Sequence, residues 1–264
     1  MRTDHKTAMP HKFLRWCVGV SSIVVGVAAW SASAFVYRPF DGTDAAVAAP
    51  GEVEIEFQPA GVLRESSQKT LLAPATVLNF GLSKDWEAIL QGQFETPLSP
   101  SGPSSLSEAG VFLKHVLRPG SLQDKSGPSV ATEFGVLLPD TIGNSRFGAS
   151  VAGIVSQRWD WGAIHLNAAA ALTREQHGDV FTGIIVEGPS KWKVRPVAEV
   201  FYEEEFGQSH TISGLVGAIW QVRDNLSFDV GFRHALTNSH SINEVRIGLT
   251  YGFPLRLLAS MDRK

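Results

Sequence analysis

Short segments in which apolar and polar side chains alternate follow one another along most of this chain. In the last of them, NEVRIGLTYGF at Asn243 to Phe253, every second residue is apolar or aromatic and the others are mostly charged or very small. Because successive side chains of a strand point to opposite faces, each segment is a ribbon with one apolar face. No apolar stripe with a 3.6-residue period reaches helix length. The pattern predicts an all-β protein whose apolar faces meet either a protein core or lipid.

Twelve such segments are predicted as strands, and their even number suits a closed antiparallel up-and-down β-barrel that spans a membrane. The connections after odd-numbered strands look longer and more polar, at 99–106, 139–146 and 236–242, than those after even-numbered strands. This asymmetry is typical of short periplasmic turns and longer outer loops. We expect the barrel to occupy residues 51–253. The predicted strands are 52–63, 71–82, 86–96, 107–117, 129–138, 147–158, 163–173, 179–188, 193–204, 210–221, 226–235 and 243–253.

The two ends of the chain predict export. Residues 1–34 combine a basic start, an apolar run at 18–30 and the small residues Ala32-Ser33-Ala34, which together indicate a secretory signal peptide cleaved near Ala34. We expect residues 35–50 to form a periplasmic lead and residues 254–264 a C-terminal extension. The single cysteine, Cys17, leaves with the signal, so no disulfide is expected. Cleavage removes four basic residues and one acid, which makes an already acidic chain more so and argues against a nucleic-acid partner.

Tryptophan positions favour lipid over a soluble core. Outside the signal, all five tryptophans stand beside the turns assigned to the periplasmic side, as in an aromatic girdle at one membrane interface. They are Trp86, Trp159, Trp161, Trp192 and Trp220. We therefore expect the outer membrane of a Gram-negative-type cell as the location and outer-membrane lipid as a partner. The expected lipid face includes Leu72, Leu78, Phe80, Leu90, Phe94, Val111, Leu113, Phe134, Val136, Ile164, Leu166, Ile212, Val216, Phe228, Val230 and Phe232.

The opposite face carries many charges, and acids outnumber bases. Isolated ions are costly in a dry interior, so a wet or ion-paired lumen is implied. Two interpretations stay open: a narrow selective pore, or a closed lumen of Glu/Arg pairs. We expect no catalytic residues, no cofactor and no metal. The predicted lumen-lining residues are Glu56, Gln91, Glu133, His165, Asn167, Glu199, Asp229, Arg233 and Arg246.

Two resemblances sharpen these expectations. Arg246 to Phe253 (RIGLTYGF) resembles the terminal signal by which outer-membrane barrels are recognised by their assembly machinery, which implies that machinery as a partner. The segments TLLAPATVLNFGLSKDW, SVATEFGVLLP, GAIHLNAAAAL, LSFDVGFRHAL and NEVRIGLTYGF resemble the outer-membrane family named for the meta-pathway of phenol degradation. The likeness covers roughly Gly51 to Phe253. It implies transport of aromatic or other apolar compounds and no catalytic residues.

The expected function is passive passage of small molecules through an outer-membrane channel. A lipid hydrolase is the alternative enzyme class, because Arg233 to Ser241 contains His and Ser on a predicted outer loop. Such residues also dominate ordinary polar loops, and their spacing does not match that of known barrel lipases. Fatty-acid release from phospholipid would distinguish the two.

Overall fold

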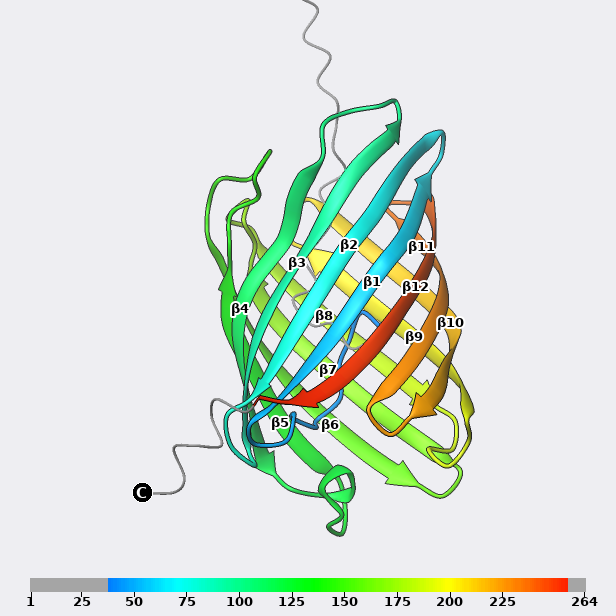
Figure 1. Ribbon diagram of the computed structural model, residues 1–264. Helices are drawn as coiled ribbons and strands as arrows, with labels where there is room; N and C mark the ends of the chain where they lie inside the picture. Colours follow the sequence, from blue (N-terminus) through cyan, green and yellow to red (C-terminus); the bar gives the residue numbers. More distant parts are fainter. Residues whose placement is uncertain (1–37, 256–264) are drawn as a thin grey trace, which may run out of the picture. The chain divides into compact units, whose positions relative to one another are not determined.

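Twelve antiparallel strands close into a single barrel in the computed structural model, which describes residues 38–255 (Figure 1). Each strand pairs with its neighbours in sequence, and β12 closes the ring by pairing with β1. The predicted fold is confirmed. One 3₁₀ turn, η1 at Ser121–Gln123, follows β4. The strands are β1 Glu52–Glu65, β2 Gln68–Gly81, β3 Trp86–Ser99, β4 Ser105–Arg118, β5 Ser129–Leu137, β6 Gly148–Trp159, β7 Gly162–Leu172, β8 Gly178–Glu187, β9 Val194–Glu205, β10 Ser209–Arg223, β11 Leu226–Thr237 and β12 His240–Pro254.

The predicted strand ends lie within about three residues of the observed ones. The prediction that connections after odd-numbered strands are longer than those after even-numbered strands is wrong. The supposed outer loop 236–242 is a tight hairpin whose two turn residues, Asn238 and Ser239, have φ of 47° and 70°. Left-handed turn residues match the twist of paired strands and permit two-residue hairpins. A two-residue connection also joins β1 to β2, whereas residues 119–128, at the opposite end of the barrel, form one of the longest connections.

Large apolar side chains cover the outer surface of the barrel. Leu90, Val136, Val216 and Val230 are 41%, 44%, 61% and 47% exposed, as the strand alternation predicts. Leu72 differs, since it is buried. A bulge between Leu72 and Ala75 adds one residue to β2 against β3 and reverses the alternation beyond it.

Aromatic side chains gather where odd-numbered strands begin and even-numbered strands end. Trp159 and Trp161 stack there with ring centroids 5.2 Å apart, and Trp86 stacks on His115 at 4.1 Å. Trp220 packs near Phe228 at the same end. This end is called the tryptophan end below.

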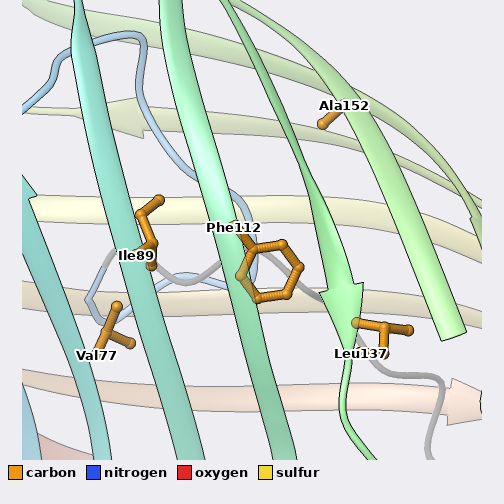
Figure 2. Packing of buried hydrophobic residues seen from close by; sticks show 5 residues of the cluster. All are labelled: Val77, Ile89, Phe112, Leu137 and Ala152. Carbon is orange, nitrogen blue, oxygen red and sulfur yellow. The ribbon is translucent and has the colours of Figure 1, made fainter. Parts of the chain in front are cut away.

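The inner wall is not uniformly polar. Val77, Ile89, Phe112, Leu137 and Ala152 come from the five consecutive strands β2 to β6 and form one buried apolar cluster (Figure 2). These residues fall on the face that also carries the inward charges, so the lumen has an apolar side as well as a charged one.

Candidate functional site: the barrel lumen and its inner segment

Residues 38–50, called the inner segment below, run inside the ring of strands (Figure 1, blue). The segment follows the inner wall, and its main-chain N–H groups donate to inward-facing side chains of different strands. The donors and acceptors are Arg38 N to Glu56 Oε2 (3.0 Å), Asp41 N to Glu199 Oε2 (2.8 Å), Gly42 N to Glu199 Oε1 (2.7 Å), Thr43 N to Asn167 Oδ1 (3.1 Å), Ala45 N to Ser156 Oγ (2.9 Å) and Ala48 N to Glu87 Oε2 (2.5 Å).

The expectation of a periplasmic lead at 35–50 is therefore wrong for its described part, residues 38–50. The physical reason is the surplus of inward carboxylates, which need donors once they are buried. An extended chain supplies a row of N–H groups for them. Residues 1–37 and 256–264, which include the predicted signal and most of the predicted extension, lie outside the described residues.

Arg38 joins the segment to β11 and β1. Its Nε and Nη2 donate to the two carboxylate oxygens of Asp229 at 3.1 and 2.9 Å, and its Nη1 donates to Gln58 Oε1 at 2.8 Å. Both charged side chains are almost completely buried. A Cβ atom at Gly248 on β12 would collide with the guanidinium, so this glycine gives Arg38 its space.

Arg246 joins the segment to β12. Its Nη1 donates to Pro39 O at 2.8 Å and its Nη2 to Asp41 Oδ1 at 2.8 Å, while its Nε donates to Glu244 Oε1 at 2.8 Å. Arg233 contacts the other oxygen of Glu244, also at 2.8 Å. These pairs match the interpretation of Glu/Arg ion pairing in the lumen.

Phe40 gives the segment an apolar anchor. Its side chain is fully buried among Ile185, Val197, Leu215 and Ile219. Burying a side chain of this size stabilises the docked segment by roughly 1.5 to 3 kcal/mol relative to leaving it exposed.

His165 and Asn167, neighbours on the inner face of β7, both support the segment. The amide of Asn167 also donates to Thr43 O at 2.9 Å, so it pairs with both main-chain groups of that residue. His165 Nδ1 lies 2.8 Å from Ser156 Oγ, and its Nε2 lies 3.3 Å from Glu187 Oε1. A serine, a histidine and an acid thus stand in line. While the segment is docked, Ser156 is fully buried and its hydroxyl accepts the Ala45 N–H, so the arrangement anchors the segment and the hydroxyl is not accessible to a substrate.

A cavity of about 200 Å³ lies between the inner segment and the wall formed by β1 to β5. Glu133 and Gln91 line it. Lys114 also lines it and donates to Thr43 Oγ1 at 3.0 Å, with Asp44 Oδ1 3.9 Å away. Within residues 38–255, no cluster of three or more His, Cys, Asp or Glu residues is arranged to hold a metal ion.

At the barrel end opposite the tryptophans, Arg174 folds inward from the β7–β8 connection. It is buried and donates to Leu138 O at 2.6 Å and Ala109 O at 2.9 Å, with Glu108 and Asp140 at 3.7 and 3.4 Å. Arg174 therefore ties the β7–β8 connection to β4 and to the β5–β6 connection at this end of the barrel.

All nine predicted lumen residues are thus on the inner wall, and eight of them are at most 8% exposed; Gln91, which donates to Glu108 O at 3.3 Å, is half-buried. Five of them, Glu56, Asn167, Glu199, Asp229 and Arg246, contact the inner segment directly, and the strand pattern indicated neither this segment nor the roles of Arg38, Lys114 and Ser156. The one available signal was the excess of inward acids over inward bases.

The proposed hydrolase stretch forms part of the β11–β12 hairpin, where His234 Nδ1 lies 2.9 Å from Asn243 Oδ1.

Comparison with known proteins supports the fold. No family model and no curated protein matches the sequence. Among solved structures, an outer membrane channel from Pseudomonas putida F1 is similar with a TM-score of 0.59 at 7% identity, over 79% of this chain and 97% of that one. The NanC porin is similar with a TM-score of 0.53 at 7% identity, over 75% of this chain and 98% of that one. At such identities the likeness concerns the fold alone.

Proposed function

We propose that this protein is an outer-membrane channel for small molecules whose passage is closed when the inner segment is docked. Three features support a barrel in lipid: the closed ladder that leaves no strand edge, the apolar outer surface, and the aromatic residues gathered at one end. The charged inner wall supports a lumen that water can enter.

One observation carries the gating part of the proposal. Within the described chain, residues 38–48 are held to the strands by side-chain hydrogen bonds and ion pairs, whereas main-chain bonds to strands begin only at Ala49 and Gly51, with Glu52 N donating to Ala49 O and Gly51 N donating to Gly81 O. The β-ladder therefore does not depend on the docked segment. The segment can leave the lumen without breaking a strand pair, and water then replaces its bonds to the wall.

Departure of the segment would also set the charge preference of the passage. Glu56, Glu199 and Asp229 would lose their donors from residues 38–42 and face the lumen as carboxylates. Fixed negative charge in a narrow pore concentrates cations and repels anions. Changing these three residues to Gln, Gln and Asn is expected to lower cation selectivity and to weaken docking, because the same carboxylates accept the bonds of the segment.

A disulfide lock tests the gating proposal. A Cβ atom at Gly42 would lie 3.1 Å from Cγ of Asn167, close to the separation of about 3 Å between a Cβ and the partner sulfur in a disulfide. The double variant Gly42→Cys, Asn167→Cys is expected to form the bond with the segment docked. In planar bilayers the oxidised protein should conduct little, and reduction should restore conductance. The single variant Asn167→Cys is the matched control. Equal conductance before and after reduction would contradict a gating segment.

Location and assembly belong to the same proposal. The protein should fractionate with outer membranes and migrate anomalously in gels unless boiled in detergent. We further propose that β12 engages the barrel assembly machinery through Arg246 to Phe253. Recovery in the soluble fraction would argue against both.

The solute class suggested by the family resemblance also remains a proposal. Aromatic or other apolar compounds suit the apolar cluster of β2 to β6, which forms one side of the lumen. Uptake of phenol into proteoliposomes, compared with uptake of a sugar of similar size, would test this part. No preference for phenol over the sugar would count against an apolar cargo.

A further inference from the structure

The cavity beside the inner segment holds more acid than its neighbours satisfy. Five carboxylates line it, and the single lysine among the lining residues is Lys114. Its volume of about 200 Å³ exceeds that of cavities known to hold benzene, about 150 Å³. The five acids are Asp44, Glu54, Glu56, Glu87 and Glu133.

Glu133 is the group that most requires a partner. It is only 2% exposed and lines the cavity, yet among residues 38–255 its carboxylate accepts no hydrogen bond, because its basic neighbour Lys114 donates to Thr43 Oγ1 instead. By contrast, Glu56 accepts from Asn79 Nδ2 at 2.8 Å, and Glu87 accepts from Ala48 N. Several buried carboxylates around one ammonium are unfavourable unless a further cation or protons enter.

The other lining residues restrict what that cation is. Ile89, Val47 and Ala46 give the cavity apolar walls, which suit a carbon framework. An anionic ligand would meet five acids and one lysine. A bare metal ion would need a ligand cluster that the described residues do not form.

We propose that this cavity binds a small organic cation, a protonated primary amine on an apolar framework, with its ammonium donating to Glu133. The inner segment forms one wall, so the site exists only while the segment is docked. A role of this site in transport rests on the proposed channel function, but amine binding to the cavity does not require that the protein conduct.

Isothermal titration of the detergent-solubilised full chain with benzylammonium chloride tests the proposal. Benzyl alcohol, the neutral molecule of similar shape, is expected to bind at least about tenfold more weakly, because it lacks the charge-assisted hydrogen bond. Glu133→Gln should weaken benzylammonium binding by about tenfold or more. Glu203→Gln, which changes a buried acid outside the cavity, is the matched control and should leave binding unchanged.

A second variant keeps the proposal testable if Glu133→Gln does not fold. Lys114→Met removes the cation that competes for the same acids, so it should tighten benzylammonium binding several-fold. If the acids have only a structural role, Lys114→Met should bind benzylammonium no more tightly than the wild type does, and that result would contradict the proposal. Wild-type protein that does not bind benzylammonium, or that binds benzyl alcohol equally well, overturns the site.

Bilayer recordings on the same preparation separate this site from the proposed function. Conductance without amine binding would leave the channel standing and reject the site. Amine binding by the wild type, together with no conductance from Arg38→Met, which removes the ion pair that holds the segment, would support the site and reject the channel.

Discussion

Replacing Arg38 with Met is expected to release the inner segment. The change removes two charge-assisted hydrogen bonds to Asp229 and one to Gln58, and it leaves the Asp229 carboxylate buried without its cation. Losing one partner of a buried ion pair costs roughly 3 to 5 kcal/mol. When the segment leaves, Asp229 is solvated by lumen water, so this cost falls on the docked state alone.

Each 1.4 kcal/mol changes an equilibrium tenfold, so the ratio of undocked to docked segment should rise by roughly a hundredfold to several thousandfold. A thiol under the segment measures this ratio. Ser156 is fully buried beneath Ala45, and Ser156→Cys in a Cys17→Ser background gives one reporter cysteine. The rate of its reaction with a water-soluble maleimide should increase with the undocked fraction until that fraction approaches one.

Asp229→Asn supplies the control for this reasoning. Arg38→Met combined with Asp229→Asn leaves no buried unpaired charge, so the double variant should be labelled more slowly than Arg38→Met alone. A labelling rate in Arg38→Met within about twofold of wild type, or a double variant that is labelled faster still, would refute the argument that this ion pair holds the segment.

Three further outcomes are expected. Val230→Arg should lower the free energy of unfolding of the barrel in vesicles by roughly 2 to 4 kcal/mol in urea titrations, because residue 230 is exposed on the outer apolar surface. Val230→Leu should not have this effect, and equal losses in the two variants would place residue 230 against protein. Gly248→Ala should raise the labelling rate of the Ser156→Cys reporter, because the added Cβ atom collides with Arg38. Gly214→Ala, whose Cβ atom meets nothing within 4 Å, should not raise it, and identical rates in the two variants would show that Arg38 moves aside without releasing the segment. Deleting residues 246–264 should abolish the heat-modifiable form, because β12 pairs with both β11 and β1; a persistent heat-modifiable band would show that eleven strands and a remnant suffice.

The amino-acid sequence alone was enough to predict the barrel wall. A two-residue alternation is a local property, so the two faces of each strand can be predicted without reference to its neighbours. The number of such segments predicted the number of strands, and the tryptophan positions separately favoured lipid outside the barrel. Local exceptions escaped this reasoning. The bulge beside Leu72 inserts one residue and so exchanges the inward-facing and outward-facing positions of β2. The hairpin at Asn238 and Ser239 needs left-handed backbone angles, and its polar residues are equally typical of a longer loop.

Only the tertiary structure revealed what fills the barrel. Residues 38–50 carry no periodicity of their own, and their partners are single residues such as Glu199, Asp229 and Arg246 on strands far apart in sequence. These residues face one another only after the ring has closed, so no segment of the sequence contains the site. The surplus of inward acids indicated that donors were missing. In the closed ring, the main chain of the inner segment and the side chain of Arg38 supply these donors. An extended chain suits this role because its N–H groups can reach carboxylates on strands around the inner wall.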